Sequence, residues 1–445
     1  ARVEPPRAPL STLEVMRRLL RNSIEVWPPA TYERPFLRRP FFGRETILVM
    51  EPEMIRQVLV EKSDAFEKAE VMRRALEPAL GSGLLTAEGA RWRWQRRAVA
   101  PIFRHERLET FVPPIVKAAE RTRARWTAQA GNEIDVASEM MRLTFEIIVA
   151  TMLSGAGTLD VERVERGVSE YLRSTGWSVL LTLLRVPAWL PHPGSRRSAR
   201  ARAYLRNEML RLVRERRAAP GPRGDLLALL IDASDPETGQ AMTDQELVDN
   251  LLTFISAGHE TTALALTWTF YLLSLHPAIE ARVLDEIARV VPNGAVASEH
   301  IEQLVFTRQV LNEAMRLYPP AALITREATR DVTIGTEHIA KGTTVNIPVY
   351  AVHRHHALWE RPDAFDPDRF AGEPAKARHR FAYLPFGGGP RICIGMAFAQ
   401  MEAVAILATL LPAAHLTLRH GYVPEPRLRV TLRPAAGMPM RIAVR

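Results

Sequence analysis

Cys393 is the only cysteine in the 445-residue chain, and it lies in a glycine-rich loop, FGGGPRICIG. Glycine lets a backbone pass close to a flat, bulky group, and the apolar run after the loop predicts a helix whose first N–H groups would stabilise a thiolate. A lone cysteine cannot form a disulfide within its own chain. The loop therefore favours a thiolate that serves as a ligand or a reactive group over a small buried apolar side chain.

A second group of residues that could take part in a reaction lies inside a long apolar stretch, at AGHETT (residues 257–262). Gly258 and the paired Thr261 and Thr262 are poor residues for a helix interior, where glycine alone costs about 1 kcal/mol. A threonine hydroxyl can bond back to the carbonyl one turn earlier, so we expect the helix to open locally here. The simpler alternative is a core helix with one charged residue, Glu260, turned outward.

Two further pairs of residues share a helix face. Glu313 and Arg316, in LNEAMRLYPP, are three residues apart, and Trp92 and Arg96, in GARWRWQRRAV, are four apart. Taken alone, the first pair is compatible with a surface ion pair. The second is compatible with a basic helix, such as one that binds nucleic acid.

Taken in their order along the chain, these segments resemble the motifs of the cytochrome P450 family, the haem-thiolate monooxygenases. The family's loop, F-x-x-G-x-R-x-C-x-G, is matched at every specified position, by Phe386, Gly389, Arg391, Cys393 and Gly395. WRWQR, AGHETT, EAMR and FDPDRF precede the loop in the family's order. The resemblance implies a single cytochrome P450 domain over residues 45–445, mainly α with a small β portion, and an N-terminal segment over residues 1–44 that leads into it.

The resemblance assigns the residues around the iron of haem b. Cys393 would be the axial thiolate ligand, and Phe386 would pack near its sulfur. A thiolate ligand favours O–O bond cleavage. Glu260 and Thr261 would form an acid–alcohol pair that delivers protons where dioxygen binds, in a groove that includes Gly258.

The resemblance also implies partners for the two haem propionates, which need cations in a protein interior. These partners would be Trp92, Arg96, Arg326 and Arg391. His353 could also reach a propionate. The histidines at 353, 355 and 356 lack a carboxylate or cysteine at ligand spacing, so they favour a polar loop over a metal site.

A buried network behind the haem would hold the fold together. The resemblance places Arg369, from FDPDRF, against Glu313 and Arg316, with Asp368 standing where the family more often has glutamate. The expected role is structural, because removal of one partner would leave a buried charge without its counter-ion.

The reaction implied is insertion of one oxygen atom of O2 into a small apolar substrate, by hydroxylation or epoxidation. By analogy with the family, apolar residues would line the substrate pocket: Leu85, Phe254, Ala257, Leu323, Ile324 and Met438. The alternatives are a peroxide-driven peroxygenase and a non-catalytic haem-binding sensor.

Electrons would come from NAD(P)H through a separate redox partner, because the sequence contains no G-x-G-x-x-G motif, flavin domain or cysteine set for an iron–sulfur cluster. We expect an acidic ferredoxin and a ferredoxin reductase. The ferredoxin would dock on a basic face that includes some of Arg91, Arg93, Arg97 and Arg104.

These side chains must be positioned by a chain whose apolar residues recur mostly every three or four positions, which predicts a helical protein. A Thr243–Glu246 capping pattern and Pro277 bound one unusually long helix around AGHETT. The strands expected are few and short: 46–50, 331–335, 343–349 and 428–433.

Composition limits the remaining classes of protein. With 47% hydrophobic residues the chain is neither disordered nor fibrous, and its net charge of +9 is spread along the sequence rather than gathered in a tail, so nucleic-acid binding is not favoured. The first thirty residues carry no secretory signal or membrane anchor, and the uncharged run 261–279 is more typical of a buried helix. We therefore expect a cytoplasmic monomer.

Overall fold

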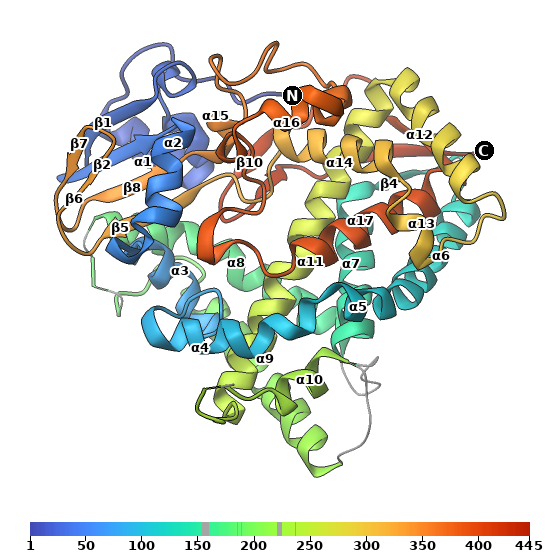
Figure 1. Cartoon of the computed structure of the whole chain (residues 1–445), viewed down its shortest axis with the longest axis horizontal. Helices are drawn as coiled ribbons and strands as arrows, with labels where there is room; N and C mark the ends of the chain where they lie inside the picture. The colour runs from blue at the N-terminus through green and yellow to red at the C-terminus, as the bar shows by residue number, and fades with distance from the viewer. Residues whose placement is uncertain (154–159, 185, 188, 220–224, 236) are drawn as a thin grey trace.

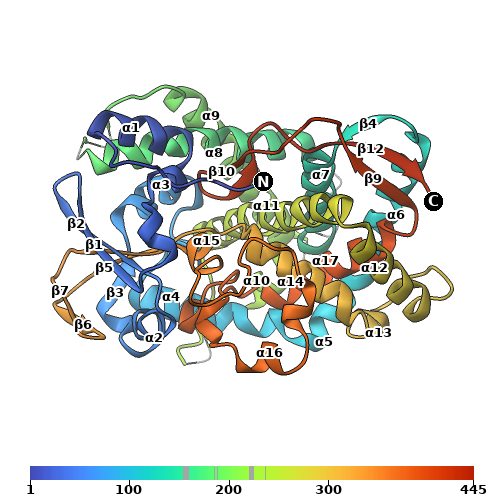
Figure 2. The ribbon, with the colours of Figure 1, turned by 90° about the horizontal axis from the view of Figure 1, so that it is seen from above.

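The longest helix, α11 (Asp244–Leu275), runs through the centre of the molecule (Figures 1 and 2). This computed structural model describes residues 1–153, 160–184, 186–187, 189–219, 225–235 and 237–445. As the sequence predicts, Thr243 caps α11: its hydroxyl accepts from the Glu246 N–H, and the Glu246 carboxylate accepts from the Thr243 N–H at 3.0 Å. His276 ends the helix next to Pro277.

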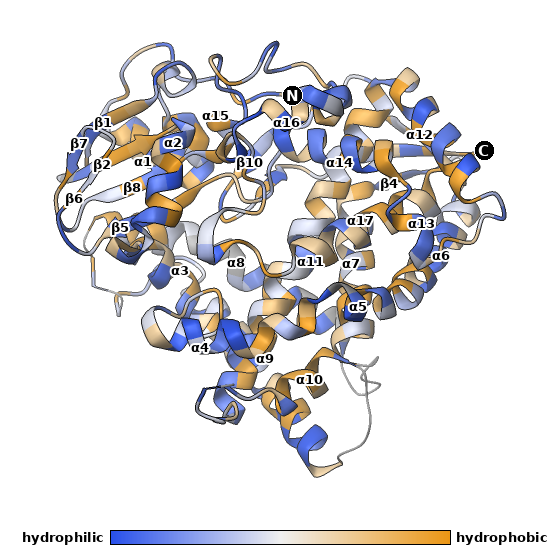
Figure 3. Ribbon diagram, in the orientation of Figure 1, coloured by the Kyte–Doolittle hydropathy of each residue, from blue (hydrophilic) through white to orange (hydrophobic). Residues whose placement is uncertain are grey.

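The other helices surround α11. They are α1 (Thr12–Arg21), α2 (Pro52–Arg56), α3 (Glu70–Leu80), α4 (Gly89–Val99), α5 (His105–Leu108), α6 (Val112–Ala128), α7 (Val136–Met152), α8 (Val161–Leu183), α9 (Ser195–Ala218), α10 (Leu226–Asp232), α12 (Pro277–Val290), α13 (Ser298–Ile301), α14 (Val305–Leu317), α15 (Val349–Val352), α16 (Gly372–Ala377) and α17 (Met396–Leu410). Outer helices such as α12 carry hydrophobic and hydrophilic residues together (Figure 3), as expected for helices with one buried face.

The largest sheet lies at one end of the molecule and has the order β1-β2-β8-β5-β3 (Figures 1 and 2). Its strands are β1 (Phe36–Phe41), β2 (Arg44–Val49), β8 (Thr344–Ile347), β5 (Ile324–Ala328) and β3 (Phe66–Lys68). Only β2 and β8 pair in parallel; the other neighbours are antiparallel. Because β1 pairs with β2, the predicted division between residues 44 and 45 falls inside a hydrogen-bonded hairpin.

Smaller sheets complete the fold. At the opposite end lie β4 (Glu133–Asp135), β12 (Pro439–Val444) and β9 (Ala414–Leu418) (Figure 2). Two hairpins are formed by β6 (Val332–Ile334) with β7 (Glu337–Ile339) and by β10 (Pro426–Leu428) with β11 (Leu432–Pro434). Three predicted strands are thus confirmed as β2, β6 and β8. The single strand predicted over 428–433 is wrong: buried Leu428 and Leu432 pair across the hairpin, and residues 429–431 form its turn.

Nearly all of α11 is buried, which explains its apolar composition on every face. From Leu247 to Leu273, only Ser256, Ala257, Gly258 and Thr261 are incompletely buried. Among the described helices, none alone is long and apolar enough to cross a membrane; α11 and α12 meet the length and composition criteria only as a pair bent by 114°. The local opening expected at AGHETT does not occur, because residues 244–275 form one uninterrupted helix.

Candidate functional site

A cavity of about 440 Å³ lies between the middle of α11 and the loop that contains Cys393. The four incompletely buried residues between Leu247 and Leu273, which are Ser256, Ala257, Gly258 and Thr261, all line it. Its other walls come from α3, α4, β5 and the turn between β10 and β11. Segments that carry the predicted motifs therefore converge on this one cavity.

The thiol of Cys393 is accessible from inside this cavity, although protein surrounds it. The Cys393 N–H donates to the Phe386 carbonyl at 2.9 Å, so the loop closes on itself just before α17. Gly389 has φ +69°, and a Cβ there would collide with the Leu59 carbonyl oxygen, so only glycine fits. Burial raises the pKa of Cys393, whereas the backbone of Gly395 and the positive charge of Arg96 act to lower it.

Lys68 and Arg326 face each other directly across the β3–β5 pair. Two like charges opposite one another destabilise a sheet unless an anion lies between them. Burial, followed by the nearby charge of Arg391, lowers the pKa of Lys68 to about 7 and that of Arg326 to about 10. Glu88 is a carboxylate that partly balances Lys68, Arg326 and Arg391, which leaves an excess of positive charge at the cavity wall.

This excess charge suits a ligand with two carboxylates. Arg391 also stacks over Trp92 with its guanidinium 4.3 Å from the ring centre, and it donates to the Ala87 carbonyl at 3.1 Å. Arg96, on the same helix α4, lines the cavity near Cys393, and burial lowers its pKa. A flat, dianionic group with a metal that takes a thiolate ligand, such as haem, fits this set of residues.

The predicted acid–alcohol pair lies on the α11 wall. The Thr261 hydroxyl donates to the Ala257 carbonyl at 2.7 Å, one turn earlier, as the sequence predicts. Gly258 allows close packing against α7, because a Cβ there would lie 2.6 Å from Ile148 Cδ1. Glu260 does not turn outward: it is 3% exposed and is bound by a residue pair from the β10–β11 hairpin, described below.

The predicted pocket residues Leu85, Phe254, Ala257, Leu323 and Ile324 all line the cavity. Met438 is placed elsewhere: it is fully buried in the main hydrophobic core, and its N–H donates to Asp135 at 2.7 Å. Among the described residues of the C-terminal region, Val430 and Thr431 reach the cavity instead. The reason is the hairpin that replaces the predicted strand, since its turn projects into the cavity.

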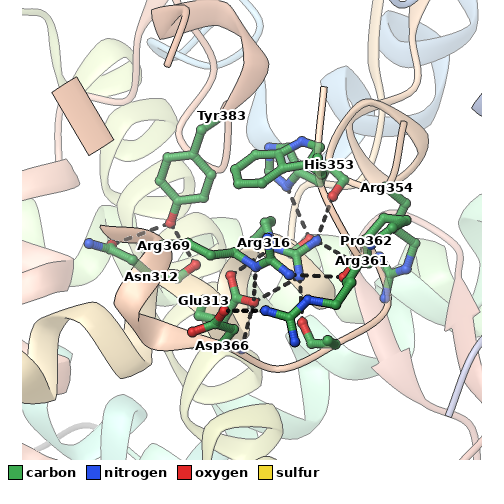
Figure 4. A network of polar contacts seen from close by, with 12 residues as sticks. Asn312, Glu313, Arg316, His353, Arg354, Arg361, Pro362, Asp366, Arg369 and Tyr383 are labelled. Carbon is green, nitrogen blue, oxygen red and sulfur yellow. Dashed lines mark hydrogen bonds and ion pairs between the residues drawn. The ribbon is translucent and has the colours of Figure 1, made fainter. Parts of the chain in front are cut away.

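Behind the cavity, Glu313 and Arg316 form a buried ion pair with Arg369 beside it (Figure 4). Arg369 Nε lies 3.4 Å from Glu313 Oε1, as the resemblance implies. Asp368 does not join them; it pairs with Arg282 at the surface.

His353 belongs to this network and not to the cavity (Figure 4). Its Nδ1 lies 3.2 Å from the Arg316 carbonyl, and its Nε2 accepts from the Leu384 N–H at 2.7 Å. These partners require a neutral ring with the proton on Nδ1. Burial, reinforced by Arg316, lowers the pKa of His353 to about 3. The suggestion that His353 reaches a propionate is therefore wrong, because both of its nitrogens are occupied.

The predicted basic face is only partly free for a partner. Arg91 lies 3.4 Å from Glu246, and Arg97 lies 3.2 Å from Asp235, so acidic neighbours offset both charges. Arg93 and Arg104 are exposed.

Several site residues have no signal in the sequence around them. Lys68, Val430, Thr431 and Arg433 sit in unremarkable short segments, and only the pairing of β3 with β5 and the β10–β11 turn bring them to the cavity or to Glu260. The like-charged Lys68 and Arg326 could be found from sequence only if the strand register were known.

Comparisons with known proteins agree with this geometry. The family model "Cytochrome P450" matches residues 30–437. Cyclooctatin synthase of Streptomyces melanosporofaciens is 36% identical over 377 residues, covering 82% of this chain and 80% of that protein. Cyclooctat-9-en-7-ol 5-monooxygenase of the same organism is 34% identical, with 82% and 78% coverage. Cytokinin hydroxylase of Arabidopsis thaliana is 33% identical, with 88% and 77% coverage.

The fold agrees as well. The crystal structure of the cytochrome P450DA heme domain superposes with a TM-score of 0.82 at 28% identity, covering 92% of this chain and 90% of that chain. These comparisons favour the cytochrome P450 family over the nucleic-acid-binding alternative, which rested on the net charge and on the basic helix that carries Trp92 and Arg96. The chain belongs to the cytochrome P450 family and is an oxidoreductase of that family.

Proposed function

We propose that this cytochrome P450 hydroxylates or epoxidises an apolar substrate in the cavity beside α11, with haem b as its resident cofactor. The observation that carries the proposal is the position of Cys393, whose thiol opens into the same cavity as four cations and the Thr261 wall. Haem with a thiolate ligand supplies the activation of O2 for insertion of one oxygen atom.

Each residue of the site has a proposed task. Cys393 ligates the iron with Phe386 packed beside it, and the propionates are bound by Trp92, Arg96, Arg326, Arg391 and, in addition to the sequence prediction, Lys68. Thr261 presents its hydroxyl at the cavity wall, where its bond to the Ala257 carbonyl fixes the oxygen's position. Glu260, one residue earlier on α11, supplies the carboxylate of the proton path.

The chemical class of the substrate is proposed from the lining and from the relatives. Phe254, Ala257, Leu323, Ile324 and Val430 present apolar surface, which favours a lipid-like or multi-ring compound with few polar groups. One bacterial relative is named for oxygenation of cyclooctat-9-en-7-ol. We propose an apolar alcohol or hydrocarbon of this kind and take cyclooctat-9-en-7-ol as the first probe.

Two measurements test the function. The reduced protein with carbon monoxide is expected to show a thiolate-type absorbance band, and an imidazole-type band in fresh folded protein would contradict the assignment of Cys393. Titration with cyclooctat-9-en-7-ol and related compounds is expected to give a type I spectral shift, followed by an oxygenated product when NADPH, a ferredoxin and its reductase are added.

The same assay separates the alternatives. Product with hydrogen peroxide but none with the reducing system would favour a peroxygenase. A haem spectrum that responds to ligands without any product under either condition would favour a sensor.

For electron transfer, we propose a ferredoxin that docks on the face bearing Arg93 and Arg104. Surface charges steer association, and salt screens them over a Debye length of about 10 Å at 0.1 M. The reduction rate should fall as ionic strength rises, and Arg93→Gln should weaken that dependence. A rate independent of salt would contradict steering by this face. The monomeric state and the cytoplasmic location stay predictions.

A further inference from the structure

The Glu260 carboxylate is bound by two residues of the β10–β11 hairpin. The Thr431 hydroxyl donates to Glu260 Oε1 at 2.5 Å, and Arg433 Nη2 forms an ion pair with the same oxygen. Arg433 also donates to the Thr431 hydroxyl oxygen at 3.3 Å. The three side chains form a closed triangle that joins α11 to the hairpin.

The exposure of the three residues to solvent increases from Glu260 through Thr431 to Arg433. Glu260 is 3% exposed and Thr431 7%, whereas the Arg433 side chain is 33% exposed. Glu260 and Thr431 line the cavity. Arg433 lies outside the described lining and therefore extends from the cavity wall toward solvent.

A buried carboxylate needs a partner, and the identity of its partner determines where it points. Of the residues that contact Glu260, Arg433 alone carries a full charge, so it supplies most of the force that holds the carboxylate on the hairpin side of α11. The sequence motif AGHETT contains Glu260 but nothing that would orient it. Orientation comes from a segment more than 170 residues later.

We propose that Arg433 is a positioning residue for proton delivery. Arg433 fixes the Glu260 carboxylate at the cavity wall and connects it to solvent. This inference rests on the proposed function, in which Glu260 belongs to the proton path. Arg433 touches neither the substrate space nor the cofactor site, so its effect is exerted through Glu260.

The experiment compares purified, haem-loaded wild-type protein with Arg433→Gln, which removes the charge, and with Arg433→Lys, which keeps it. Arg419→Gln is the matched control, because Arg419 forms an exposed ion pair with Glu133 in a distant sheet. Oxygen consumption is measured without organic substrate, with NADPH, a plant-type ferredoxin and its reductase, in H2O and in D2O. Hydrogen peroxide is quantified at the same time.

Misplacement of a catalytic group by about 1 Å costs about a hundredfold in rate, so a partly displaced carboxylate should slow proton-dependent oxygen consumption by about tenfold. Arg433→Gln should show this loss, with a larger solvent isotope effect. Arg433→Lys should recover most of the rate, and Arg419→Gln should match wild type. The carbon-monoxide spectrum and haem content should be unchanged in all variants, because none touches the cofactor site.

Equal rates and isotope effects in wild type and Arg433→Gln would overturn the proposal, as would a loss that Arg433→Lys does not recover at all. If Arg433→Gln does not retain haem, Thr431→Val replaces it, and an isotope effect equal to wild type in that variant would also overturn it. A failure of the proposed function is distinguishable, because it appears in the wild-type spectrum and product assay. Non-additive effects of Glu260→Gln and Arg433→Gln on the unfolding midpoint test the coupling without turnover.

Discussion

Arg316 and Glu313 form a fully buried ion pair in which Nε donates to Oε2 at 2.7 Å and Nη2 donates to Oε1 at 2.8 Å. The remaining N–H groups of Arg316 donate to carbonyls of the long irregular segment before the cysteine loop: His353, Pro362 and Ala364. All five donors of this guanidinium are therefore satisfied (Figure 4). The pair anchors the segment that leads toward Cys393 onto α14.

Arg316→Lys should destabilise the fold strongly. Lysine has three donors and no planar fork, so carbonyls and the Glu313 carboxylate would be left without partners in a dry interior. We expect a loss of about 3–5 kcal/mol in the free energy of unfolding. Urea denaturation followed by tryptophan fluorescence measures it. Arg282→Lys, in an exposed pair with Asp368, is the control and should cost less than about 1 kcal/mol.

His353 should make the fold sensitive to acid. Burial lowers its pKa in the folded protein to about 3, whereas the unfolded chain titrates near the ordinary value of about 6.5. The unfolded state therefore binds more protons between these values, and stability contributed by neutral His353 is lost as pH falls from about 6.5 to 3. His353→Gln should show a flatter dependence of the unfolding midpoint between pH 7 and 4, while His420→Gln, at an exposed position, should follow wild type. Parallel curves for wild type and His353→Gln would contradict this.

Glu402 should make the folded protein less stable as pH rises, which is the opposite of the effect of His353. This α17 carboxyl is fully buried, and burial raises its pKa to about 8, with the Thr262 hydroxyl offsetting only part of the shift. The folded protein binds the extra proton, so stability falls as pH rises from about 4.5 to 8. Glu402→Gln, which mimics the neutral acid, should gain stability over wild type progressively across this range. A difference that stays constant from pH 5 to 9 would show that Glu402 does not titrate there.

Lys68 and Arg326 should slow the dissociation of haem from the protein. A hydrogen bond to a charged group contributes about 1.5–3 kcal/mol, so Lys68→Gln or Arg326→Gln should speed haem loss by about tenfold or more. Transfer of haem to an excess of apomyoglobin measures the rate without any turnover. Arg330→Gln, in an exposed ion pair with Asp64, is the matched control. Loss at the control rate from both Lys68→Gln and Arg326→Gln would remove these residues from the cofactor site.

Features that depend on near neighbours in the chain are predictable from the sequence alone. The capping box of α11, the bond from Thr261 back to Ala257 and the Glu313–Arg316 pair each join residues three or four positions apart. Helix geometry brings such residues together wherever the helix lies. The cysteine loop was equally predictable, because its glycines restrict the backbone locally.

Which distant segments meet becomes known only from the folded structure. The facing of Lys68 and Arg326, the contact of Glu260 with Arg433 and the exclusion of Met438 from the cavity all depend on strand register and on one hairpin turn. The segment 428–433 illustrates the reason: its apolar pattern suits a strand, but the burial of Leu428 against Leu432 folds it back on itself. Side-chain periodicity specifies which face is apolar, whereas the partner of that face is selected by packing of the whole chain.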